Sequence, residues 1–506
     1  MPEQQQWEFP EKLIFGRAQY HPSYREWLPL WKYYQAIFDG SDGAKEYLTK
    51  FVEEEIAAYK IRQKDSAFPR ICARALGVFT GHIFSQPPDT SRLPEKLKYL
   101  DDNFDGDGTD AITFLQDQHR APVMPLGACY LLVTKPIATT PIANREQEIA
   151  QGLQPMVVPF SPIQLVKWDF DEQGNLLYVV LKDKYRRSGG FTEEHVEYEL
   201  LRVWTQTSWA LYHSKEDSTE GVQSSSYELL SSGKHKLGEV PLVAMYNMRQ
   251  SRFCGTTEMR TLGLADFALD IYSKITWLDQ GLKYQGFPIP VILSQDEDLT
   301  MVKAGPGYGI QLKGENDDAK MLETTGQALS LLNDKITSSK MEFLDTAFRQ
   351  LSPTKATGGN EAAEKKKLDL SQLVAAVKAK GNNVQEAHRN VCRLAAKWEG
   401  LPTEGFADWV GYSIEVTPEA FVATVDEIGK LYATYGIIDH ETAFEMVKNN
   451  GELPESIEYS EVEARIALEQ EDNARRLAAS QDNTTTSSSG GQQPPPQGGN
   501  NGGTTQ

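Results

Sequence analysis

Three segments between residues 263 and 398 carry apolar residues at the three- and four-residue spacing of amphipathic helices. The first two helices are predicted at Gly263–Lys283 and Thr325–Leu351. The third runs from Glu361 to Trp398, about 55 Å at about 1.5 Å per residue. Its apolar positions recur every seven residues, at Leu370, Val377, Val384, Val391 and Trp398. This spacing is typical of one helix face packed along a partner.

The chain before residue 260 shows two patterns. Residues 1–100 are rich in aromatic residues at helical spacing, and Arg70–Phe84 predicts a helix that ends at the following prolines. From residue 128 the period changes to that of strands. Strands are predicted at Ala128–Thr134, Gln164–Phe170, Leu176–Lys182, Val196–Val203, Trp209–Tyr212 and Val240–Tyr246. The pattern indicates an α+β fold, mainly helical, with helices packed on antiparallel strands.

The segments around the three long helices are shorter or more polar. Residues 287–324 predict a small α/β module, in which Pro290–Leu293 is a strand and Glu315–Asp318 an acidic loop. Thr354–Asn360 is too rich in glycine to be helical. Gly381 and the two asparagines after it are predicted to weaken or kink the third helix. Residues 418–480 again predict helices, and residues 481–506 lack the apolar groups that ordering requires.

Composition limits the classes of protein to consider. A length of 506 residues predicts two to four domains. The formal net charge of −20 argues against a tight DNA binder, because such proteins neutralise phosphates with Lys and Arg, and it suits a surface that DNA passes without sticking. No apolar run approaches the roughly 20 residues of a membrane helix. No secretory signal is expected, and four scattered cysteines indicate neither disulfides nor zinc but a reducing origin.

One acidic cluster, Asp101–Asp110, resembles the opening of a calcium loop. Its twelfth position is Ile112 where a bidentate Glu is required, so we favour a turn followed by a helix capped by Thr109 or Asp110. A metal-dependent nuclease built on this cluster stays an alternative. His82 is predicted to be a satisfied core histidine. The sequence contains no nucleophile elbow, phosphate loop or HExxH, so we expect no catalytic residue, no metal, no cofactor and no enzyme activity.

Seven sequence motifs occur in a definite order along the chain. They are YREWLPLWKYYQAIFDG (24–40), GHIFSQPP (81–88), FDGDGTD (104–110), GACYLLVTKP (127–136), PFSPIQLVKWDFDEQGNLLYVVLKD (159–183), TKATGGNEAAEKKKLDLSQL (354–373) and KWEG (397–400). Over residues 20–400 this order resembles that of bacteriophage portal proteins, in a subfamily known only as a phage family of unknown function.

The resemblance implies a portal-like subunit. Portals are rings, usually of twelve subunits, at one capsid vertex, where they serve DNA packaging and ejection. The implied regions are a wing (1–262), stem helices (263–286 and 325–351), a clip (287–324), a tunnel loop (352–360), a spine helix returning to the wing (361–417), a crown (418–480) and a disordered tail (481–506). The implied partners are the packaging terminase, a tail adaptor, the major capsid or scaffolding protein, and double-stranded DNA held without sequence specificity. The protein would reside in the virion after assembly in the host cytoplasm, without a membrane.

The resemblance also implies two sets of site residues. The tunnel loop would present Ser352, Thr354, Lys355, Thr357 and Asn360 to DNA. The clip would present Asp296, Glu297, Asp298, Glu315, Asp317 and Asp318 to the motor or adaptor. Lys355 is the one cation of the tunnel segment, so a strong grip on phosphate is not expected. A head–tail adaptor or other connector ring stays the second interpretation, although such proteins are generally shorter and lack the paired stem helices with a clip.

Overall fold

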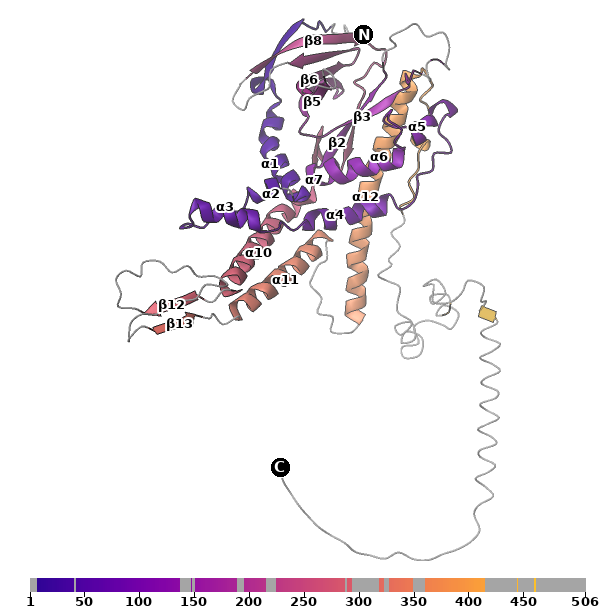
Figure 1. Ribbon diagram of the computed structural model, residues 1–506. Helices are drawn as coiled ribbons and strands as arrows, with labels where there is room; N and C mark the ends of the chain where they lie inside the picture. The colour runs from indigo at the N-terminus through magenta and orange to yellow at the C-terminus, as the bar shows by residue number, and fades with distance from the viewer. Residues whose placement is uncertain are drawn as a thin grey trace, which may run out of the picture. The chain divides into compact units, whose positions relative to one another are not determined.

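The computed structural model describes residues 7–40, 42–136, 147, 151–188, 195–214, 224–286, 289–293, 318–322, 327–348, 360–414, 444 and 459–460. The chain divides into two units, Met1–Val416 and Thr417–Gln506. All elements named below belong to the first unit (Figure 1). The predicted crown and tail lie in the second unit, almost wholly outside the described residues.

The helices include the three long ones that the sequence predicts. They are α1 (Pro22–Asp39), α2 (Asp42–Lys45), α3 (Ile56–Asp65), α4 (Ile71–Ile83), α5 (Tyr99–Asp102), α6 (Ala111–Gln118), α7 (Met124–Leu126), α9 (Glu258–Thr261), α10 (Leu264–Gly286), α11 (Gln327–Ala347) and α12 (Asn360–Trp398). Among the described helices, none is both long and apolar enough to cross a bilayer.

The strands form two larger sheets and two hairpins. They are β1 (Lys12–Gly16), β2 (Ala128–Thr134), β3 (Met156–Phe160), β4 (Leu165–Phe170), β5 (Leu176–Ser188), β6 (His195–Thr205), β7 (Ser208–Ser214), β8 (Ser224–Lys234), β9 (Leu242–Tyr246), β10 (Met248–Ser251), β11 (Cys254–Thr256), β12 (Ile289–Leu293) and β13 (Asp318–Leu322). One antiparallel sheet has the order β1-β8-β7-β6-β5-β4, and a second has the order β3-β2-β9. The predicted α+β class is therefore confirmed.

The first strand corrects the prediction that residues 1–100 are helical. Lys12–Gly16 forms β1, which pairs with β8 from Lys12 opposite Glu228 to Gly16 opposite Ser224. Neither strand is predicted by its own sequence, because β8 is rich in serine and β1 is short. The long-range pairing between them, and not local preference, makes both of them strands.

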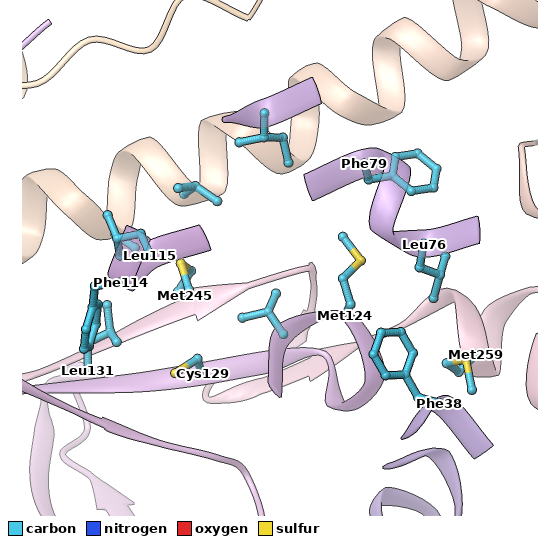
Figure 2. Packing of buried hydrophobic residues seen from close by; sticks show 14 of the residues in the cluster. Phe38, Leu76, Phe79, Phe114, Leu115, Met124, Cys129, Leu131, Met245 and Met259 are labelled. Carbon is cyan, nitrogen blue, oxygen red and sulfur yellow. The ribbon is translucent and has the colours of Figure 1, made fainter. Parts of the chain in front are cut away.

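Strand β2 separates two hydrophobic cores, because both of its faces are buried. Cys129, Leu131 and Val133 belong to the core beneath the helices. Ala128, Tyr130 and Leu132 face the core of the six-stranded sheet. Figure 2 shows side chains of the first core from α4 (Leu76 and Phe79), α7 (Met124) and the strands β2 and β9 (Cys129, Leu131 and Met245). This central strand is the continuous apolar run expected for burial on both sides.

Helix α12 packs against β9 and α4 along its predicted stripe. Val377, Val384 and Val391 are fully buried, and the Trp398 Nε1 atom donates a 3.0 Å hydrogen bond to the Val133 carbonyl of β2. The predicted weak point at Gly381 does not interrupt the helix, which is continuous from Asn360 to Trp398. At Gly381 a Cβ atom would lie 2.0 Å from Ile414 Cδ1, so this glycine makes room for a packed neighbour.

The prediction for His82 is wrong, because this residue is partly exposed on α4. Among the described residues, the fully buried histidines are His119, whose Nδ1 lies 2.9 Å from Thr80 Oγ1, and His388, whose Nδ1 lies 3.1 Å from the Tyr412 hydroxyl. Burial, with the nearby Lys380 charge, lowers the pKa of His119 to about 3. Burial lowers the pKa of His388 to about 4.

These two histidines predict an acid-sensitive fold. They stay neutral in the folded protein, whereas in the unfolded chain each takes up a proton near pH 6.5. The free energy of unfolding should therefore fall as the pH drops from about 6.5 towards 4. Each of the two histidines should contribute about 1.4 kcal/mol for every pH unit. Urea titrations between pH 7 and 5 measure this slope. The variant His388→Gln should show a smaller slope than the wild type, and an equal slope in both proteins would contradict the assignment.

Candidate functional site

Helix α10 lies between α3 and α11 and contacts them with opposite faces (Figure 1). Phe267, Lys274 and Gly281 recur every seven residues on the α11 side. Thr276 and Lys283 recur with the same spacing on the α3 side. At 100° per residue the two rows lie about 200° apart around the helix. The three helices therefore form one layer with α10 in the middle.

Aromatic, polar and close-packed contacts join α10 to α11. The rings of Phe267 and Phe343 meet edge to face with centroids 5.8 Å apart. Lys274 Nζ donates a 3.2 Å hydrogen bond to Ser339 Oγ. A Cβ atom at Gly281 would lie 2.5 Å from Leu329 Cδ2, so the glycine lets the helices approach closely. These contacts make α10 and α11 an antiparallel hairpin, which agrees with the predicted pair of helices.

A buried arginine fixes α3 and the preceding loop on the other side of α10. Arg62 is 1% exposed, and its Nε and Nη2 atoms donate to the two Glu54 carboxylate oxygens at 2.8 and 2.7 Å. Nη2 also donates to the Thr49 carbonyl at 2.9 Å, and Nη1 donates to Thr276 Oγ1 of α10 at 3.2 Å. The guanidinium lies 4.3 Å from the Phe51 ring centroid. Hydrogen bonds from Arg62 are the main cause that lowers the pKa of the Glu54 carboxyl.

The two strands between α10 and α11 pair as an antiparallel hairpin. Ile289 lies opposite Leu322, and Leu293 lies opposite Asp318. Asp318 thus begins β13, which corrects its predicted place in the acidic loop. The other predicted clip residues, Asp296, Glu297, Asp298, Glu315 and Asp317, lie outside the described residues.

The predicted tunnel residues end where α12 begins. Asn360 is the first residue of this helix, one position earlier than predicted. Ser352, Thr354, Lys355 and Thr357 lie outside the described residues. The structure thus brings none of the predicted tunnel and clip side chains together among the residues that it describes.

A buried ion pair that the sequence did not reveal ties α12 to α9 and the end of β9. Lys380 Nζ donates to Glu258 Oε1 at 2.6 Å and to Asn247 Oδ1, and Asn247 Nδ2 donates to Glu258 Oε2 at 2.6 Å. Burial alone would raise the pKa of the Glu258 carboxyl, but Lys380 and the hydrogen bonds outweigh it and lower the pKa. The pair holds α12 at a fixed register against α9 and the residue after β9.

The acidic cluster at Asp101–Asp110 has the predicted turn-and-cap structure. Asp105 Oδ1 accepts backbone N–H groups of Asp107 and Thr109 at 2.9 and 3.2 Å. Asp110 Oδ1 accepts the Thr113 N–H at 2.9 Å and caps α6. These hydrogen bonds lower the pKa of both carboxyl groups against the opposing effect of burial. Within the described residues no group of three metal-ligating side chains is placed to hold an ion.

A cavity of about 1110 Å³ opens between the β4–β5 turn, β9 and α12. Its charged lining includes Arg393, which donates to both carboxylate oxygens of Glu239 at 2.6 and 3.0 Å. Lys397 binds the same carboxylate from the next turn of α12. The ion pairs here join α12 to the segment before β9, so their role is structural.

Comparisons with known proteins add one family match. A family model described as "Domain of unknown function (DUF4055)" matches residues 261–399. This range runs from the last residue of α9 to the residue after α12, so it contains both helices of the hairpin and the long helix. A search of curated proteins gives no match for this chain.

Two solved structures resemble the chain over most of their length. A chain in the neck of an empty GTA particle, computed with C6 symmetry, has 11% identity and a TM-score of 0.36, covering 81% of this chain and 97% of that one. A chain in the neck of a native GTA particle, computed with C12 symmetry, has 12% identity and a TM-score of 0.34, covering 81% and 96%. Scores at this level carry no argument about fold or function.

Proposed function

We propose that this chain is the subunit of a bacteriophage portal, a ring-shaped channel at one vertex of the capsid. The observation that carries the proposal is the α10–α11 hairpin, linked by a small stranded module and followed by a 39-residue helix. Long helices in this order supply walls for a channel. The ordered sequence segments between residues 24 and 400 that resemble portal proteins support the same function.

The proposed mechanism is mechanical and electrostatic. A net charge of −20 keeps the channel from binding the DNA that moves through it. Ser352, Thr354, Lys355, Thr357 and Asn360 would contact the DNA backbone without reading its sequence. The chain would not be an enzyme, since the sequence offers no phosphate loop and ATP hydrolysis belongs to the packaging terminase.

The proposed surroundings are those of a virion component. The acidic clip residues between Asp296 and Asp318 would dock on basic surfaces of the terminase during packaging and of the tail adaptor afterwards. The ring would be assembled in the host cytoplasm and built into the capsid with the major capsid or scaffolding protein. A connector ring at the head–tail junction is the competing function, and it would bind the tail side without binding the terminase.

Imaging and mass measurement of the purified protein test the proposal. We expect rotationally averaged negative-stain images to show a ring with an open centre wide enough for duplex DNA. The solution mass should be a multiple of 56.7 kDa, about 680 kDa for twelve copies. A variant ending at residue 480 is the control and should form the same ring, because the removed residues lack apolar groups. A single-copy mass at every concentration would rule the proposal out.

A further inference from the structure

The side of α3 that points away from α10 is exposed and both apolar and basic. Arg62 points inward, and the residues at helical spacing on the other side of the helix reach the solvent. Ile56 is 67% exposed, and Ile61 is 59% exposed. The α3 face consists of Ile56, Ala57, Lys60, Ile61 and Lys64.

The side of α11 that points away from α10 is exposed, apolar and acidic. The buried residues Ile336, Ser339 and Phe343 lie on the inner side of this helix. Leu331 and Met341, on the outer side, are 70% and 62% exposed. The α11 face consists of Gln327, Leu331, Asp334, Ser338, Met341 and Asp345, which follow one another every three or four residues.

The two faces lie on opposite flanks of one layer, because α10 contacts α3 and α11 with opposite sides. Each face combines exposed apolar side chains with one sign of charge. The lysines Lys60 and Lys64 stand on one flank, and Asp334 and Asp345 stand on the other. Exposed apolar side chains that gather with charge in this way mark an interaction surface. The opposite charges make each face a match for the other and a poor match for itself.

We propose that the α3 face of one copy docks on the α11 face of the next copy. Such a contact is head-to-tail, since it joins two different patches, and it repeats from copy to copy until the ring closes. It would cover Ile61 and Met341 and place Lys60 and Lys64 against Asp334 and Asp345. The inference rests on the proposed ring and names the surfaces that hold its neighbouring subunits together.

Charge reversal on each flank, alone and combined, tests this contact. One variant carries Lys60→Glu with Lys64→Glu, and a second carries Asp334→Lys with Asp345→Lys. Each should raise the protein concentration of half-assembly by about tenfold or more, because like charges then face each other. A chain with all four changes should assemble as the wild type does, since every junction again pairs opposite charges. Mass distributions over a range of concentrations measure assembly.

Two controls keep the outcomes distinct. Lys236→Glu changes an exposed lysine after β8 and should leave assembly unchanged. Thermal unfolding should be similar in all variants, since Lys60, Lys64, Asp334 and Lys236 are exposed and Asp345 is only half-buried. If the variants changed on one flank form normal rings, the two faces do not meet. The same conclusion follows if the chain with all four changes does not regain wild-type assembly. Either result contradicts the proposed contact but not the proposed ring. If the wild type never assembles, both the contact and the proposed portal fail.

Discussion

The substitution Lys380→Met should lower the free energy of unfolding by about 3–5 kcal/mol, as expected when one partner of a buried ion pair is removed. The Lys380 side chain is 2% exposed and that of Glu258 is fully buried. Without the ammonium group the Glu258 carboxylate loses its charged partner, while Asn247 still donates to it. Urea denaturation at a fixed protein concentration measures the loss, because assembly makes stability depend on concentration.

A matched variant on the same helix separates the effect of burial on stability from the effect of removing a charge. Lys397 contacts Glu239, but its side chain is 32% exposed and Arg393 binds the same carboxylate. Lys397→Met should therefore cost about 1 kcal/mol or less. Combining Lys380→Met with Glu258→Gln removes both charges and should recover part of the loss. Equal costs for the Lys380 and Lys397 variants would show that the buried pair does not hold α12 in place.

The substitution Gly255→Ala should destabilise the fold by about 3 kcal/mol or more, because its backbone crosses that of Gly127 without space for a methyl group. A Cβ atom at Gly255 would lie 1.9 Å from the Gly127 carbonyl oxygen. That oxygen accepts the Asn247 N–H at 3.0 Å, so it cannot move freely. Gly127 itself has φ of 89° and leads into the central strand β2. Denaturation midpoints of the purified variant measure the effect.

A second glycine gives the opposite expectation. Gly77 lies within α4, and a Cβ atom there would meet nothing within 4 Å. Gly77→Ala should raise the free energy of unfolding by about 0.5–1 kcal/mol, since alanine favours the helix more than glycine does. Stabilisation by Gly255→Ala, or a large loss from Gly77→Ala, would contradict the backbone crossing as the cause.

The sequence predicts the helical part of the fold well, because the helices follow local periodicity. The predicted seven-residue stripe corresponds to Val377, Val384 and Val391, all fully buried. The ends of α10 and α11 differ from prediction by at most four residues.

The features that the sequence did not reveal depend on residues far apart in the chain. Lys380 and Glu258 are 122 positions apart, and a lysine in a polar helix ordinarily reaches solvent. Arg62 and Thr276 are 214 positions apart. The opposite placement of the α3 and α11 faces follows from their shared neighbour α10, which no periodicity shows. Of the predicted site residues, only Asn360 and Asp318 lie among those described, so the proposed DNA and motor contacts stay predictions.

The pairing of β1 with β8 has a consequence for the newly synthesised chain. Gly16 leaves the ribosome long before Ser224, its partner in the sheet. At about 5–20 residues per second the delay is roughly 10–40 s. During this interval Lys12–Gly16 has no native strand to bind, and its backbone is open to chaperones or to other nascent chains. Completion of the six-stranded sheet is therefore timed by translation, and slow codons before β8 would lengthen the period of exposure.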